Sequence, residues 1–432
     1  MIRLTRANRA TATIAVAAVS ALAALLILST LAPRTVAADG PHLSTGATTD
    51  NCAACHRSHT AQDEHLLEST PESALCFSCH DGTGAATNIA AEYNDLNVPA
   101  NDPASSSYYS HLDLGSAHVN GQIDEFAGVS NRHASCTDCH NPHAVNSAPS
   151  QPSPGGWTPS GALTNIPGVT AGVAWQQAAT LEYELCLKCH SRYTILLSST
   201  TPTYNKTDKA AELDPTAASY HPVAAPGKNT TSQLQNSLNG GTVWQLGTAS
   251  TIRCTQCHGN YRLVGDPPSS NVPASAARLA PHTSQYRSIL IANYRNRDLK
   301  AQNEAYNPDD FTLCYLCHSE APFATTGDGP RTDTNFGYHG MHLNNISDEG
   351  GGGGTDINAP GAGQGNAICA ECHFELHSTS LSPWSTNRTY SRGVNFGPNV
   401  QARTGQIAPA WDLGSRTCAL VCHGEDHESE DY

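Results

Sequence analysis

Methionine and aromatic residues are scarce in this chain of 432 residues. There are two methionines, Met1 and Met341, and 6% of the residues are aromatic. Hydrophobic residues make up 38% of the chain and charged residues 14%, whereas Gly (35) and Pro (26) are plentiful. This composition provides little material for a conventional side-chain core. Something besides side chains must therefore fill the interior.

Basic residues are also few, and this limits the partners of the protein. Lys and Arg total 23 against 38 Asp and Glu, which gives a net charge of −15. Residues 1–38 hold four Arg and no acid, so their removal lowers the net charge from −15 to −19. A protein this acidic repels nucleic acid and anionic lipid at long range. We therefore expect no nucleic-acid partner.

Long apolar runs are confined to the N-terminus. Three arginines in the first nine residues precede an apolar run over residues 10–32, and the small residues Val36 and Ala38 follow. This order is typical of a secretory signal peptide. We predict a signal peptide over residues 1–38 and a secreted chain, 39–432, that is extracellular or periplasmic and has no stable membrane anchor after cleavage. The alternative is an uncleaved anchor, because the run is long enough to span a bilayer.

Sixteen cysteines stand out against this background, and their spacing is regular. In an exported chain such a number would usually form disulfides. Here every cysteine belongs to a pair, and a histidine follows the second cysteine of every pair. Seven pairs have two spacer residues and the last has three. The eight units are Cys52/Cys55/His56, Cys76/Cys79/His80, Cys136/Cys139/His140, Cys186/Cys189/His190, Cys254/Cys257/His258, Cys314/Cys317/His318, Cys369/Cys372/His373 and Cys418/Cys422/His423.

The C-x-x-C-H pattern is the attachment signature of c-type haem. Two thiols a few residues apart can reach both vinyl groups of one haem as thioethers, and the next residue then presents its imidazole to the iron. Zinc sites also use paired cysteines but need no histidine directly after the pair. The sequence therefore predicts eight haem c groups with their irons, each held by two cysteines and by the motif histidine as proximal ligand.

The second axial ligand of these irons is expected to be histidine as well. Cytochromes use Met or His at this position, but Met1 leaves with the signal peptide and one methionine cannot serve eight irons. Thirteen histidines lie outside the motifs. The better distal candidates, most of them placed close to a motif or to each other, are His42, His59, His118, His143, His221, His339, His342 and His377. The weaker candidates are His65, His111, His133, His282 and His427.

The motifs alternate in a way that groups them in twos. A leucine precedes the first cysteine of the second, fourth and sixth motifs, as Leu75, Leu185 and Leu313. We predict four two-haem units over about residues 42–120, 121–200, 201–335 and 336–432. The sequence between motifs is rich in Pro, Gly, Ser and Thr, which disfavours helix and strand, although residues 173–189 and 283–306 have a helical pattern. The expected fold is one mainly irregular body, with short helices and little sheet, stapled by its haems.

On these residues the chain resembles the multihaem c-type cytochromes built from doubled C-x-x-C-H motifs. The features that carry the resemblance are Cys52–His59 with Cys76–His80, and Cys136–His143 with Cys186–His190. Some members of that group polymerise into extracellular filaments, or nanowires, of bis-His haems. The resemblance thus implies electron transport by a carrier that is not an enzyme. Its implied partners are copies of the chain itself, redox proteins or extracellular acceptors.

Two alternatives to a filament stay open. A multihaem oxidoreductase of nitrogen or sulfur compounds would need an iron with an open distal face, yet the non-motif histidines outnumber the irons and no motif ends in Lys. The sequence accordingly offers no catalytic residue. A monomeric periplasmic shuttle would use the same haems without assembly. In a filament, His42 or His427, near the two ends of the chain, could supply an axial ligand to a neighbouring copy.

Overall fold

The computed structural model describes residues 42, 49–85, 88–93, 109–111, 134–193, 208–238, 244, 246–260, 280–284, 286–324, 334, 336–344, 346, 354–378 and 391–431. The predicted signal peptide, His118 and His133 lie outside these residues. Within them, every helix is too short or too polar to cross a membrane.

Secondary structure is short everywhere in the described residues, and the longest helix and the longest strand have seven residues each. The α-helices are α2 (Thr49–Ala53), α3 (Glu72–Phe77), α4 (Ile89–Tyr93), α5 (Cys136–Cys139), α6 (Glu182–Leu187), α7 (Lys209–Glu212), α8 (Ser232–Leu238), α9 (Thr312–Tyr315), α10 (Ala321–Ala324), α11 (His339–Asn344) and α12 (Cys369–Cys372). The 3₁₀ turns are η1 (Gly161–Leu163), η4 (Cys254–Gln256), η7 (Arg287–Ile289) and η8 (Pro308–Phe311). The strands are β1 (Tyr109–Ser110), β2 (Pro152–Ser153), β3 (Gly156–Trp157), β4 (Gly168–Val169), β5 (Trp175–Gln176), β6 (Thr283–Ser284), β7 (Ala410–Asp412), β8 (Thr417–Cys422) and β9 (Glu425–Asp431).

The strands form small antiparallel sheets. Three of these are two-stranded, with pairs β1–β6, β2–β3 and β4–β5. The fourth has three strands in the order β7-β8-β9 and contains the last cysteine motif. A β-bulge interrupts the β8–β9 pairing between Cys418 and Ala419. These sheets are too small to organise the molecule by themselves.

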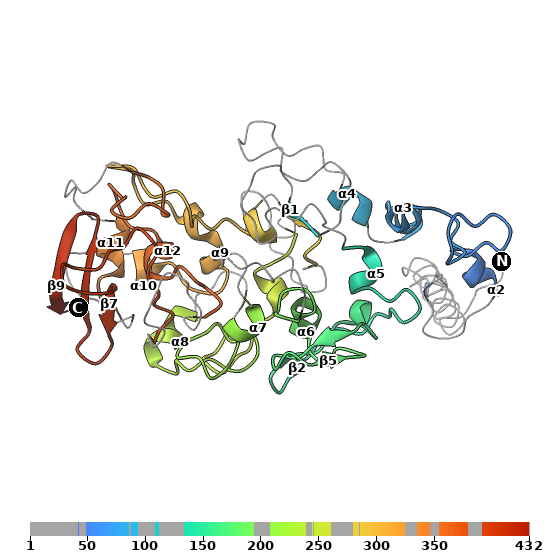
Figure 1. Cartoon of the computed structure of the whole chain (residues 1–432), viewed down its shortest axis with the longest axis horizontal. Coiled ribbons are helices and arrows are strands. Elements are labelled where there is room, and N and C mark those ends of the chain that lie inside the picture. The colour runs from blue at the N-terminus through green and yellow to red at the C-terminus, as the bar shows by residue number, and fades with distance from the viewer. Residues whose placement is uncertain are drawn as a thin grey trace, which may run out of the picture.

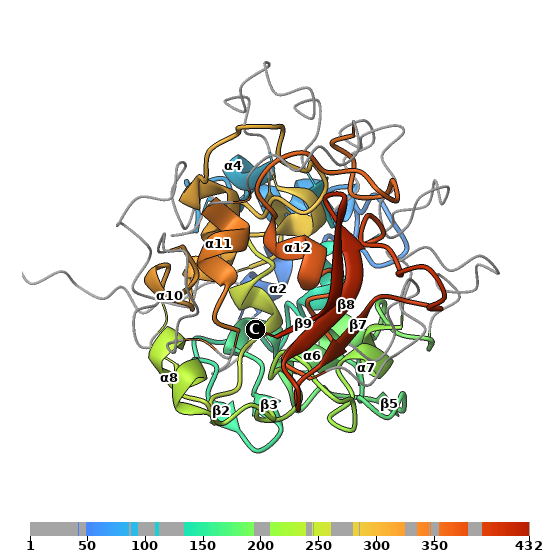
Figure 2. The same cartoon turned by 90° about the vertical axis from the view of Figure 1, so that its left-hand side faces the viewer.

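The chain runs along the long axis of the molecule broadly from its N-terminal to its C-terminal part, although β1 lies beside β6 (Figure 1). Figure 1 shows α2 and α3 at one end, α5 and α6 near the middle, and α10 to α12 with the sheet of β7 to β9 at the other end. The view along this axis shows the described elements arranged around a central region, with the C-terminal sheet nearest the viewer (Figure 2). The first and last cysteine motifs therefore lie at opposite ends of the body.

The two stretches with a helical pattern are helical only in part. In 173–189 the helix α6 begins at Glu182, because residues 168–176 form the β4–β5 pair and Val173 has a φ of 63°. In 283–306 the structure has β6 and η7, and both Ser288 and Ile289 have positive φ, 60° and 54°. An L-residue in this left-handed region cannot continue a right-handed helix.

Among the described residues, side-chain packing is concentrated from Val169 onward. Three clusters of buried hydrophobic residues are centred on Phe311 and Ile368, on Leu187 and Ile252, and on Trp411. Among the described residues, none of the clusters includes a residue before Val169. The N-terminal part therefore has little side-chain core, which fits the composition of the sequence.

Candidate haem-binding site

Seven of the eight cysteine motifs form the same tight turn. In each, the backbone N–H of the histidine donates to the carbonyl of the first cysteine four residues earlier, at 2.8–2.9 Å, as from His56 to Cys52 and from His373 to Cys369. Residues at i, i+3 and i+4 of such a turn share one face. Both thiols and the imidazole of a motif are thus presented together, as haem attachment requires. The eighth motif differs, because it lies on strand β8.

A side chain inside the motif closes the start of the third, fifth and seventh turns. Asp138, Gln256 and Glu371 each accept the backbone N–H of the residue before the first cysteine, at 2.7, 2.8 and 2.8 Å. This is one half of a capping box, which satisfies a backbone donor that the short helix leaves unpaired. These residues stand at the second spacer position, so the spacers of C-x-x-C-H carry structural information that the sequence analysis missed.

An acidic residue joins neighbouring units at two junctions. Glu72, four residues before Cys76, accepts from the backbone N–H and the hydroxyl of Thr137, at 2.9 and 2.8 Å. Glu182 stands four residues before Cys186 in the same way. It accepts from Thr255 Oγ1 at 2.9 Å and from Arg253 Nε at 2.6 Å.

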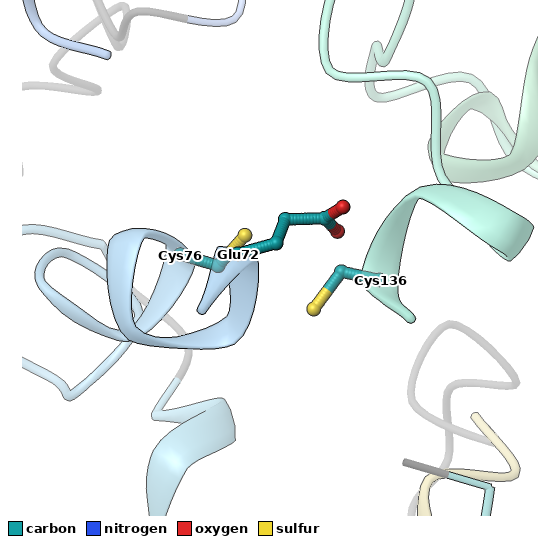
Figure 3. A group of neighbouring side chains, drawn as sticks. All are labelled: Glu72, Cys76 and Cys136. Carbon is teal, nitrogen blue, oxygen red and sulfur yellow. The ribbon is translucent and has the colours of Figure 1, made fainter. Parts of the chain in front are cut away.

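These junctions bring the first cysteines of successive motifs together. Figure 3 shows Glu72 and Cys76 on α3 beside Cys136 on α5, and the ligand atoms of the three residues lie within 4.8 Å of one another. A hydrogen bond with Cys136 raises the pKa of the Cys76 thiol. In the same way, a hydrogen bond with Cys254 raises the pKa of Cys186, and a hydrogen bond with Cys314 raises that of Cys369. As free thiols, Cys76 and Cys136 could hold a metal ion with Glu72, but each belongs to a complete haem-attachment motif.

Within each predicted two-haem unit, other cysteines of the two motifs influence one another. Burial raises the pKa of Cys55, and the neighbouring Cys79 raises it further. Burial and then Cys314 raise the pKa of Cys257 to about 12. After burial, Cys186 raises the pKa of Cys139, and Glu371 and then Cys418 raise that of Cys372. Cysteines of successive motifs therefore influence one another both within the predicted two-haem units and between them.

Five motif histidines face a second histidine across a constant gap. The ring centroids of His56 and His143, of His80 and His42, of His140 and His282, of His190 and His111, and of His258 and His377 are 6.0–6.1 Å apart. A bond from a metal to an imidazole nitrogen is about 2 Å long, so two imidazoles on one iron have ring centres about 6 Å apart. The geometry fits an iron between each pair.

Hydrogen bonds orient four of the motif imidazoles, three of them in these pairs. The Nδ1–H groups of His56, His140, His258 and His373 donate to backbone carbonyls at 2.7–3.0 Å. This fixes the tautomer and leaves Nε2 to the metal, as is general for ligating histidines. Burial also lowers the pKa of His80 and His140, which favours the neutral form that binds iron.

The distal histidines form a repeated arrangement. The Nδ1–H of His42 donates to the carbonyl of Pro142, the residue before His143, at 3.0 Å. His111 donates to Pro281, the residue before His282, at 2.7 Å. His221 donates in the same way to Leu376, the residue before His377. In the first two copies, the donating histidine, His42 or His111, faces the histidine of the second motif of a predicted unit. The other histidine, His143 or His282, faces the histidine of the first motif.

The remaining distal candidates are distributed as follows. His221, His339 and His342 line the central cavity, whereas His59 is exposed and does not. Burial, together with the neighbouring His221 and His373, lowers the pKa of His318 to about 4. His111 and His282, which stand more than twenty residues from the nearest motif, were only weak candidates in the sequence, and no local pattern singles them out.

One continuous cavity of about 3050 Å³ connects the motifs. Ordinary ligand pockets have about 300–1,000 Å³. All sixteen cysteines and seven of the eight motif histidines line the cavity, whose walls are mostly apolar, and His423 does not. An apolar channel with paired thiols and opposed imidazoles along its length fits a row of haems.

A comparison with known families supports this site. The family described as "Doubled CXXCH motif" matches residues 45–85. The match covers the first two motifs, Cys52–His56 and Cys76–His80. No curated protein and no solved structure matches the chain. The C-x-x-C-H motifs thus indicate covalently bound haem c and a cytochrome-like electron carrier.

Proposed function

We propose that this protein transfers electrons through eight covalently bound haems arranged in motif order from one end of the body to the other. The observation that carries the proposal is one continuous cavity lined by all sixteen cysteines, with the first and last motifs at opposite ends of the long axis (Figure 1). The haems supply the redox couple of their irons. The chain holds them in line and excludes water from between them.

The proposed ligand set is complete within one chain. Five irons lie between the two imidazoles of a ring pair described above, one pair for each of His56, His80, His140, His190 and His258. The third copy of the repeated arrangement assigns His221 to the iron of His318, and the cavity-lining His339 then serves that of His373. The last iron takes His342. Because no methionine takes part, we expect low-spin haems of low potential.

Electron paramagnetic resonance of the oxidised protein tests this function against an oxidoreductase. Mass spectrometry of the denatured protein should first show eight haem additions. The resonance spectrum should then contain low-spin signals only, and nitrite or azide should leave it unchanged. A high-spin signal that responds to nitrite would show an open iron and would support the enzyme instead. Six haems or fewer would end the eight-haem proposal.

We also propose that the protein is exported and assembles head to tail into a conductive filament. The first and last motifs lie at opposite ends of the long axis (Figure 1), so end-to-end contacts would extend the row of haems. A heterologous contact that does not close into a ring gives an open filament. His42 and His427 are in ring pairs within the chain, so the contact would use surface packing rather than either of these ligands.

Negative-stain microscopy and sedimentation of the native secreted protein test the assembly. Filaments that sediment with the haem absorbance are expected. A stable monomer at high concentration would refute the filament and leave the monomeric shuttle, while the electron-transfer proposal would stand.

A further inference from the structure

The eighth motif presents its two cysteines in a different way from the others. Its extra spacer residue rules out the turn seen in the other seven, and the motif lies on strand β8. Side chains at alternate positions of a strand point to the same face. Cys418, Leu420 and Cys422 line the cavity, whereas Ala419 and Val421 do not. Both cysteines therefore border the channel, and the Cys422 Sγ also lies 3.9 Å from Glu371 Oε1.

His423 follows this strand directly, and its ring nitrogen, the Sγ of Cys422 and a carboxylate oxygen of Glu371 lie within 4.8 Å of one another. His423 has a φ of 53°, begins the turn between β8 and β9, and does not line the cavity. Its side chain is buried, and its Nε2 lies 2.7 Å from Glu371 Oε1. The other motif histidines described above use Nδ1 for hydrogen bonding and keep Nε2 for iron. In His423 the nitrogen that would bind iron is already engaged.

The partner of His423 is itself fixed in the interior. Glu371 is fully buried and accepts from Asn399 Nδ2 at 2.6 Å and from the backbone N–H of Ile368 at 2.8 Å. Turning His423 toward the cavity would break its hydrogen bond with this buried carboxylate, and leaving buried polar groups without a partner is unfavourable. His423 is thus held away from the channel.

His427, four residues later, occupies the place of a motif histidine. It lies opposite Leu420 in the β8–β9 register, and residues directly opposite each other in a sheet share a face. His427 lines the cavity. Its ring centroid is 6.3 Å from that of His342, close to the spacing of the five pairs that contain a motif histidine. The Nδ1–H of His342 donates to the carbonyl of Tyr338 at 2.9 Å, which leaves Nε2 to the metal.

We propose that the iron of the eighth haem is held between His342 and His427, and that His423 is not a ligand. The attachment sequence of this haem is then C-x-x-x-C-H-x-x-x-H, in which the first histidine anchors the hairpin through Glu371 and the second binds iron. This inference rests on the proposed function, since it requires a haem on Cys418 and Cys422.

The test compares His427→Ala with His423→Gln in the full haem-loaded protein. His59→Ala, which changes an exposed histidine off the cavity, serves as the control. Peptide mapping by mass spectrometry shows first whether Cys418 and Cys422 carry a haem. Electron paramagnetic resonance then measures the high-spin fraction. His427→Ala should convert about one eighth of the haem to high spin, because one of eight irons loses a ligand, whereas His423→Gln and the control should stay low spin.

A second variant protects the test against misfolding at the buried Glu371. His427→Met leaves His423 intact and should raise the potential of one haem, because a Met ligand raises the potential of a cytochrome iron. His427→Ala and His423→Gln could both produce high-spin iron. In that case a higher potential of one haem in His427→Met would support the proposal, and an unchanged potential would refute it.

The remaining outcomes separate this inference from the proposed function. High-spin iron in His423→Gln alone, or in neither variant, would overturn the assignment while eight attached haems keep the electron carrier intact. A peptide map without haem on Cys418 and Cys422 would overturn both this inference and the count of eight.

Discussion

The ion pair between Glu182 and Arg253 offers a sharp test of how neighbouring units are joined. It links α6, which carries the fourth motif, to η4, which carries the fifth. Both residues are buried, with 3% and 8% of their surface exposed. The carboxylate accepts from Arg253 and from Thr255. Replacing Glu182 with Ala would leave a guanidinium buried without its partner, beside the contact of Cys186 with Cys254.

The preceding junction provides a matched comparison. Glu72 occupies the same position relative to its motif and accepts two hydrogen bonds from Thr137, but it is only half buried and Thr137 is exposed. Breaking a buried ion pair from one side costs about 3–5 kcal/mol. Losing hydrogen bonds at a solvated site costs about 1 kcal/mol. We therefore expect Glu182→Ala to lower the free energy of unfolding by about 3–5 kcal/mol and Glu72→Ala by about 1 kcal/mol.

Guanidinium unfolding followed by circular dichroism measures both variants. The shift of the midpoint at an unchanged slope gives the change in free energy. Glu182→Gln should fall between wild type and Glu182→Ala, because the amide oxygen can still accept from Thr255. Equal losses for Glu182→Ala and Glu72→Ala would refute the reasoning, since burial would then make no difference to the junction.

Three further predictions concern ligands and acid stability. His282→Ala should convert about one eighth of the haem to high spin in electron paramagnetic resonance, and an unchanged spectrum would remove His282 from the ligand set. His143→Met should raise the potential of one haem in a spectroelectrochemical titration; a titration identical to wild type would show that His143 binds no iron. A hydrogen bond from Arg295 lowers the pKa of Glu304 from 4.5 to about 2. This carboxylate stabilises the fold above the higher value, and the stabilisation is lost as the pH falls to the lower one. Glu304→Gln should therefore flatten acid unfolding between these values, and a curve that parallels wild type would contradict the role of Glu304.

The sequence was most informative where haem attachment fixes the spacing of the cysteines and of the histidine that follows them. The cysteines and the histidines after them could be recognised from the C-x-x-C-H pattern alone, and seven of the eight motifs form one common turn. The leucines that grouped the motifs in twos are half-buried or buried, as Leu75, Leu185 and Leu313, and line the channel. These features are local, so a pattern in the chain can report them.

The distal histidines depend on contacts across long stretches of chain, which a single sequence does not reveal. His140 and His282 face each other although 142 residues separate them, and His111 faces His190. The helical patterns failed for a related reason. Around Ser288 the chain turns to offer its carbonyl to His258 Nδ1 at 2.7 Å, and this tertiary contact prevails over local helix propensity.

The proposed sharing of histidines between units would also order the assembly of the protein in time. In the proposed ligand set, the first iron of a unit takes its distal ligand from the following unit, as His56 does from His143 and His140 from His282. During export of the N-terminus first, the iron at His56 would stay five-coordinate until residue 143 arrives, and the iron at His140 until residue 282. Maturation would therefore proceed with one reactive iron at the growing end, and a chain stopped at about residue 200 would keep such an iron at His140.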